Sequence, residues 1–135
     1  MQAAPGVASA TEPSDKPAFG LPTSAARVEA RIAYLHKTLG ITSAQEPQFS
    51  AYAEVMRANA QAMRTLFQQR AHTNDATADG RLRWYAQLSA AYADAMQKQL
   101  AVFEPLYQSL SDAQKKAADA AFADLRIRPR HRHAG

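Results

Sequence analysis

Residues 39–45 read LGITSAQ, and this stretch predicts the end of one helix and the start of the next. Gly40 is typical of the position just beyond a helix C-terminus. Thr42 and Gln45 form a predicted capping box, in which the threonine hydroxyl accepts a hydrogen bond from the amide of Gln45. The Gln45 side chain in turn accepts from the amide of Thr42. We therefore assign both residues a structural capping role.

A second capping box follows much later in the chain. Residues 110–114 read LSDAQ, so Ser111 and Gln114 repeat the roles of a hydroxyl cap and a glutamine three residues on. Between and around the two boxes, apolar residues recur every three or four positions, which indicates amphipathic helices. We predict an all-α fold of four helices, at about 24–39, 42–70, 78–110 and 111–128. The second and third helices are long and should form a hairpin.

Two prolines interrupt these helical patterns. With Thr42 as the cap, Pro47 falls beyond the first turn of the second helix, so we expect a bend near Glu46. Pro105 removes one backbone hydrogen bond and presses on the carbonyl of Ala101. We therefore expect a kink or a brief break in the third helix.

The chain of 135 residues suits one domain. Residues 1–22 are rich in Ala, Pro, Ser and Gly without periodicity, and we predict a disordered leader there. Residues 23–128 form the helical domain, and residues 129–135 form a basic, flexible tail. The start lacks a basic and apolar signal region, so we expect a mature, processed end. The absence of cysteine excludes disulfides and thiolate metal sites.

Composition disfavours several functional classes. No cysteine nucleophile, glycine-rich phosphate loop or GxSxG motif is present, so we predict neither an enzyme nor a cofactor. The histidines His36, His72, His131 and His133 form no helical metal pair, so we predict no metal site. No run reaches the roughly 20 apolar residues of a membrane span. The net charge of +4 favours acidic partners. Aromatic residues follow the apolar stripes instead of alternating with arginines, which argues against nucleic acid as a partner.

The two capping boxes resemble the LTxxQ motif, which occurs twice in the Spy/CpxP family. Ile41 stands where the first motif has leucine, and Ser111 stands where the second has threonine. The resemblance implies a periplasmic stress protein that forms a thin, curved antiparallel dimer. It also implies an ATP-independent chaperone, which binds unfolded or partly folded client proteins and suppresses their aggregation. The alternative is a metal-responsive sensor or scavenger of the same superfamily.

The second helix carries the candidate client-binding residues. Three arginines are spaced to line one face of this helix, beside a stripe of apolar residues. The candidate client-binding residues are the arginines Arg57, Arg64 and Arg70 and the apolar residues Met56, Met63 and Phe67. A basic rim attracts acidic chains, and methionine adapts to many apolar partners. The alternative interpretation is that the methionines belong to the core and the arginines to an ordinary solvated face. Because the apolar stripes of this helix exceed what one partner helix covers, we also predict a homodimer.

Overall fold

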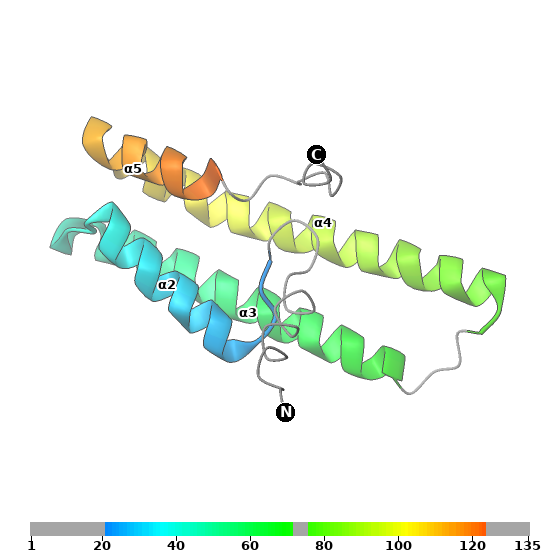
Figure 1. Cartoon of the computed structure of the whole chain (residues 1–135). Coiled ribbons are helices and arrows are strands. Elements are labelled where there is room, and N and C mark those ends of the chain that lie inside the picture. The colour runs from blue at the N-terminus through cyan, green and yellow to red at the C-terminus, as the bar shows by residue number, and fades with distance from the viewer. Residues whose placement is uncertain (1–20, 72–75, 124–135) are drawn as a thin grey trace, which may run out of the picture.

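The computed structural model describes residues 21–71 and 76–123, and within them the chain is helical with no strand. Figure 1 shows the arrangement of the helices. The elements are α2 (Ala25–Leu39), the short 3₁₀ turn η2 (Ser43–Gln45), α3 (Glu46–Ala71), α4 (Ala78–Ser109) and α5 (Asp112–Phe122). The predicted all-α class and the long hairpin, formed here by α3 and α4, are confirmed. The curved antiparallel dimer stays a prediction.

The helices form two layers. The antiparallel α3–α4 hairpin is the long layer, and α2 and α5 lie on one side of it (Figure 1). Helix α2 packs on α3 and on α5, while the closest packing in the molecule is between α3 and α4. Both α2 and α5 lie toward the end of the hairpin where α3 begins and α4 ends. That end, with η2 and the start of α5, is called the corner end below. The opposite end, where α3 finishes and α4 starts, is called the loop end.

Local signals account for the bounds of α2. The hydroxyl of Ser24 accepts a hydrogen bond from the N–H of Arg27 at 3.1 Å, which satisfies one amide at the helix start. Gly40 has φ of 63°, in the left-handed region that favours glycine, and its N–H donates to the carbonyl of Lys37 at 3.1 Å. The chain therefore leaves α2 at Gly40, as the sequence predicts.

The structure corrects the predicted position of Pro47 and rules out a break at Pro105, while a bend at either proline stays a prediction. The second helix opens as the 3₁₀ turn η2, and the α-helix itself begins only at Glu46. Pro47 consequently lies in the first turn of α3, where a missing N–H is tolerated. Helix α4 continues through Pro105 without a break. The next residue, Leu106, is fully buried, and its packing holds that part of α4 against the core.

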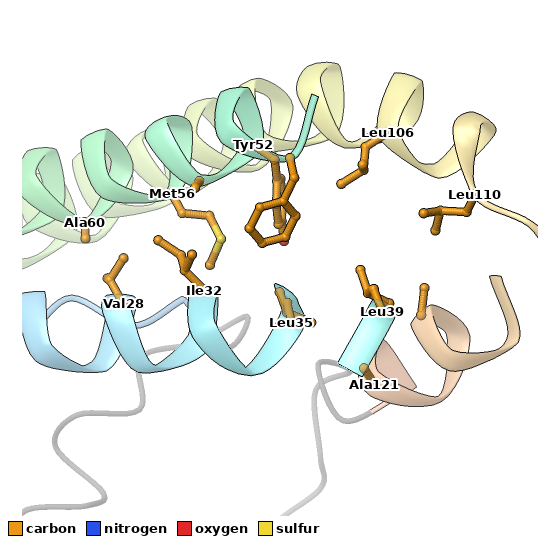
Figure 2. Packing of buried hydrophobic residues seen from close by; sticks show 13 residues of the cluster. Val28, Ile32, Leu35, Leu39, Tyr52, Met56, Ala60, Leu106, Leu110 and Ala121 are labelled. Atoms are coloured by element: carbon orange, nitrogen blue, oxygen red, sulfur yellow. The ribbon is translucent and has the colours of Figure 1, made fainter. Parts of the chain in front are cut away.

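The main core lies between α2 and the corner half of the hairpin. Figure 2 shows Val28 and Ile32 of α2 pointing at Met56 and Ala60 of α3. Farther along, Leu39 meets residues of α4 and α5. The whole buried cluster consists of Val28, Ile32, Leu35, Leu39, Phe49, Tyr52, Ala53, Met56, Ala60, Leu106, Leu110, Ala118 and Ala121.

A smaller cluster covers the middle of the hairpin. Leu21 is only 6% exposed and packs with Met63, Tyr92 and Ala95. The predicted leader ended at Pro22, but its last two residues lie within the described part of the chain, and Leu21 is buried there. The rest of that leader and the predicted tail lie outside the described residues, as does the end of the fourth helix after Ala123. Within the described part of the chain, no helix has the length and apolar character needed to cross a membrane.

Candidate functional site

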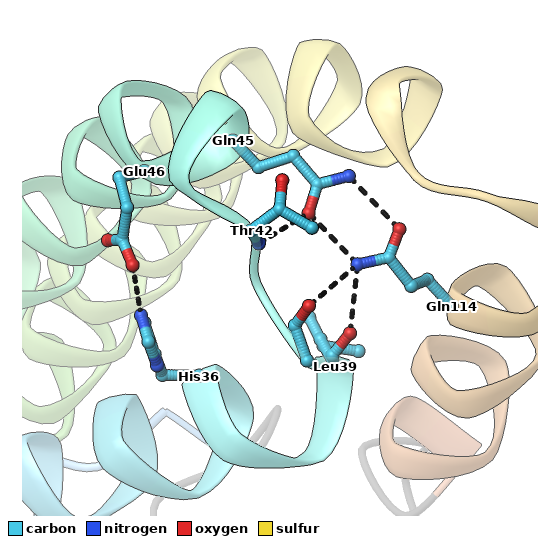
Figure 3. Close-up of polar contacts among 7 residues, drawn as sticks. His36, Leu39, Thr42, Gln45, Glu46 and Gln114 are labelled. Atoms are coloured by element: carbon cyan, nitrogen blue, oxygen red, sulfur yellow. Dashed lines mark hydrogen bonds and ion pairs between the residues drawn. The ribbon is translucent and has the colours of Figure 1, made fainter.

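The two capping boxes, far apart in sequence, meet at the corner end (Figure 3). The side-chain amides of Gln45 and Gln114 bond to each other in both directions. Nε2 of Gln45 donates to Oε1 of Gln114 at 3.0 Å, and Nε2 of Gln114 donates to Oε1 of Gln45 at 2.9 Å. These two residues are called the glutamine pair below.

Gln45 also bonds to the start of its own helix and to the end of another. Its Oε1 accepts from the backbone N–H of Thr42 at 3.0 Å, and the N–H of Gln45 donates to the Thr42 carbonyl at 2.9 Å. Its Nε2 donates to the carbonyl of Ser109, the last residue of α4, at 3.0 Å. Gln45 thus connects the start of η2 to the end of α4.

Gln114 likewise bonds to the start of its own helix and to the end of another helix. Its Oε1 accepts from the N–H of Ser111 at 2.8 Å, and its own N–H donates to the Ser111 hydroxyl at 3.1 Å. Its Nε2 donates to the carbonyls of Leu39 at 3.0 Å and Gly40 at 3.1 Å. Each glutamine therefore caps its own helix start and the helix end that precedes the other motif. The sequence predicted only that each glutamine caps its own helix start. The repeat of the motif was the signal that each also caps a second helix end.

The candidate client-binding residues of α3 do not form one open surface. Met56 and Met63 are 6% and 2% exposed, because α2 covers the first and Leu21 packs on the second. Phe67 is 37% exposed and packs edge-on against Trp84, with ring centroids 5.6 Å apart. Of the three apolar residues, only Phe67 is available to a partner of this chain.

The three arginines all have partners within the chain. Arg57 pairs with Glu29 of α2 at 2.6 Å and with Glu54 at 3.2 Å. The hydrogen bond from Arg57 is the main reason why the pKa of Glu29 lies below its usual value. The pair therefore connects α2 to α3, although both side chains remain largely exposed.

Arg64 and Arg70 bind elsewhere on the hairpin. Arg64 donates to the carbonyl of Thr23, just before α2, and to the side chain of Gln61 at 2.7 Å. The guanidinium of Arg70 lies 4.7 Å from the centre of the Trp84 ring, which is a cation–π distance. The predicted basic rim is thus dispersed over three separate contacts.

Of the six large apolar side chains that are exposed in the described part of the chain, four lie on α4, while Tyr34 lies on α2 and Phe67 on α3. Leu82 is 67% exposed, Tyr85 is 55%, Met96 is 37% and Leu100 is 48%. Their spacings of three, eleven and four residues place all four on the same face of the helix, since eleven residues make about three turns. These four residues are called the α4 strip. Apolar periodicity predicts an amphipathic third helix, but periodicity alone does not show which part of its apolar face is uncovered.

Histidine and acidic residues offer little for a metal. His36 meets Glu46 at 2.6 Å and packs edge-on against Phe49. No group of three or more His, Cys, Asp or Glu residues converges within residues 21–71 and 76–123. His72, His131 and His133 lie outside those ranges. The absence of a metal site stays a prediction.

Comparison with known proteins agrees with the repeated motif. The model of the LTXXQ motif family matches residues 27–122, which is most of the chain. This range contains both capping boxes and the glutamine pair. No curated protein and no solved structure shows significant similarity to the chain.

Proposed function

Because the chain belongs to the LTXXQ motif family, which is the Spy/CpxP type, we propose that it is a periplasmic chaperone that works without ATP. In this proposal it holds unfolded or partly folded proteins and suppresses their aggregation. Membership of a family that is typically periplasmic supports the location. The protein acts by binding and not by catalysis.

The α4 strip is the observation that carries the proposal. Leu82 and Tyr85 are more than half exposed, and all four members of the strip are large and apolar. A row of exposed apolar side chains on one helix face is typical of an interaction surface. Such a row presents several separate contacts along a helix, which suits an extended and unfolded client better than one deep pocket does.

We therefore assign the proposed client surface to α4 and not to the residues of α3 that the sequence suggested. Met56 and Met63 stabilise the core, and Arg57, Arg64 and Arg70 bind within the chain. Phe67 is the one member of the earlier set that stays in the proposed surface, since it is partly exposed at the loop end.

Aggregation of a chemically denatured model protein tests the proposal. The parent protein should suppress light scattering to the same extent with and without ATP. Replacing Leu82 and Leu100 together by serine should weaken suppression several-fold, because two exposed apolar contacts are lost. The fold should survive, since exposed substitutions typically change stability by about 0.5 kcal/mol or less.

A matched control uses exposed polar residues of the same helix. Gln87→Ser combined with Gln97→Ser makes two changes on α4 outside the strip and should leave suppression unchanged. If the parent protein does not suppress aggregation, the chaperone proposal is wrong. If it does suppress aggregation and the leucine variant acts like the parent, the client surface lies elsewhere.

A further inference from the structure

The α4 strip has a gap of about three helical turns between Tyr85 and Met96. Tyr92 lies in this gap, about two turns after Tyr85 and one turn before Met96, so it belongs to the same face of α4. Tyr92 is nevertheless only 5% exposed, whereas Tyr85 is 55% and Met96 is 37% exposed. The strip is therefore interrupted at Tyr92 because another part of the chain covers it.

The covering part is the segment of residues 21–23, which precedes α2 and is called the strap below. Leu21 is 6% exposed and packs with Met63 of α3 and with Tyr92 and Ala95 of α4. Figure 1 shows the strap, at the blue start of the described chain, near the middle of the hairpin. Without the strap, Met63 and Tyr92 would join the two halves of the α4 strip into one longer apolar surface.

The strap is attached to the hairpin by local contacts. Residues 21–23 lie in neither helix nor turn, and no backbone-to-backbone hydrogen bond joins them to another described residue. The Leu21 side chain and the hydrogen bond from Arg64 to the Thr23 carbonyl connect the strap to the hairpin. Helix α2 has its own cap, the hydroxyl of Ser24. The strap should therefore leave the hairpin without unfolding α2.

The strap also fits the hairpin incompletely. A cavity of about 20 Å³, space for roughly one water molecule, has Leu21 and Pro22 of the strap and Met63 and Met96 of the hairpin among its lining residues. Methionine side chains adapt to partners of different shape, so the surface under the strap can accept other apolar groups in place of Leu21. Segments that open for binding are commonly the weakly held parts of a fold.

We infer that the strap is an autoinhibitory cover, which competes with clients for the middle of the proposed client surface. This rests on the proposed function and adds its regulation. In the closed state, Leu21 occupies the place on Met63 and Tyr92 that an apolar residue of a client would take. A client reaches the whole surface only in the open state, so the closed population lowers its apparent affinity.

Binding of an unfolded protein tests the inference. The probe is reduced and carboxymethylated α-lactalbumin labelled with fluorescein, and fluorescence anisotropy gives its Kd. Leu21→Ser should bind the probe about fivefold more tightly than the parent, because serine no longer fills the apolar site and the open state becomes more populated. Circular dichroism should show the same helical content in both proteins.

Leu110→Ala is the matched control. Leu110 is buried at the corner end, at 5% exposure, so its truncation loosens the core far from the strap. This variant should keep the affinity of the parent for the probe. The control thus separates release of the strap from a general loss of packing.

A tethered strap should give the opposite change. The chain has no cysteine, so Leu21→Cys combined with Met63→Cys allows one disulfide, between side chains that pack together. Once mass spectrometry confirms the bond, the oxidised variant should bind the probe several-fold more weakly than the same variant reduced with dithiothreitol. Because both states belong to one variant, this comparison also holds if Leu21→Ser fails to fold.

Three results would overturn the inference. They are unchanged or weaker binding by folded Leu21→Ser, equal binding by the oxidised and reduced cysteine variant, and a gain in Leu110→Ala as large as that in Leu21→Ser. If the parent binds the probe and suppresses aggregation in any of these cases, the proposed function stands and only the cover is refuted. If neither the parent nor any variant binds the probe or suppresses aggregation, the proposed function fails as well.

Discussion

The corner end and the loop end of the hairpin use apolar side chains in opposite ways. At the corner end, Leu35 and Leu106 are fully buried between α2, α4 and α5. At the loop end, Leu82 and Tyr85 of α4 are 67% and 55% exposed. The same hairpin therefore has a closed end and an open end.

The difference follows from where the covering elements lie. Both α2 and α5 lie over the corner half, where the glutamine pair connects their ends to each other (Figure 3). Toward the loop end, the described chain covers the hairpin on that side mainly with Leu21. Burial is thus deepest at the corner end, and the most exposed members of the α4 strip lie at the loop end. The proposed holding function requires both a stable fold and exposed apolar surface, and this arrangement provides them along one pair of helices.

The largest expected effect is the difference in stability between two variants, one with a leucine truncated at the corner end and one with a leucine truncated at the loop end. Leu106→Ala should lower the free energy of unfolding by about 3 kcal/mol, because it leaves a cavity in the main core. Leu82→Ala should change it by about 0.5 kcal/mol or less, since that side chain is largely exposed already. Urea denaturation followed by circular dichroism measures both. Similar costs for the two would contradict the contrast between the ends, and would indicate that a second copy covers the loop end in the predicted homodimer.

A smaller effect on the free energy of unfolding should distinguish the glutamine pair from two independent helix caps. Gln45→Ala and Gln114→Ala should each cost about 2 kcal/mol, because each leaves backbone groups at two helix ends without a partner. The double variant should cost about 1 kcal/mol less than the sum, since the two side chains share hydrogen bonds. Gln108→Ala, an exposed glutamine of α4, is the control and should change little. Strict additivity in urea denaturation would mean that the two motifs act independently.

The smallest expected effect is an alkaline loss of stability from the core of the corner end. The pKa of Tyr52 is about 12 in the folded protein, against 10 for an exposed tyrosine, and burial is the main cause. The folded state therefore holds this proton more tightly than the unfolded state. The resulting stabilisation is complete below pH 10 and is lost as the pH rises toward 12.

Tyr52→Phe removes this contribution. Between pH 10 and 11, the parent should lose about 1 kcal/mol more stability than the variant in urea denaturation. Tyr92 and Tyr107, whose pKa values are also raised, are present in both proteins and cancel in the comparison. Equal losses would show that Tyr52 is solvated at high pH and that the corner end is less closed than the structure indicates.

The sequence by itself determined the helices and most of their ends. Gly40 and the residues of the two capping boxes act on backbone groups within four residues of themselves, so their effects are readable without knowledge of the fold. Apolar periodicity likewise predicted the all-α class and the long hairpin, because each amphipathic helix needs a partner for its apolar face. Even the error at Pro47 was local, since a 3₁₀ turn before the α-helix moved the proline into the first turn.

The tertiary structure alone decided what each apolar face meets. Met56 and Met96 both lie at helical spacing from other apolar residues, but the position of α2 made the first a core residue and left the second partly exposed. The contact between Gln45 and Gln114 likewise depends on segments that are distant in sequence. Burial and pairing are properties of the packed helices together, whereas helix capping and periodicity belong to single segments of the chain. For this reason the candidate site moved from α3 to α4, while the helices stayed largely where the sequence predicted them.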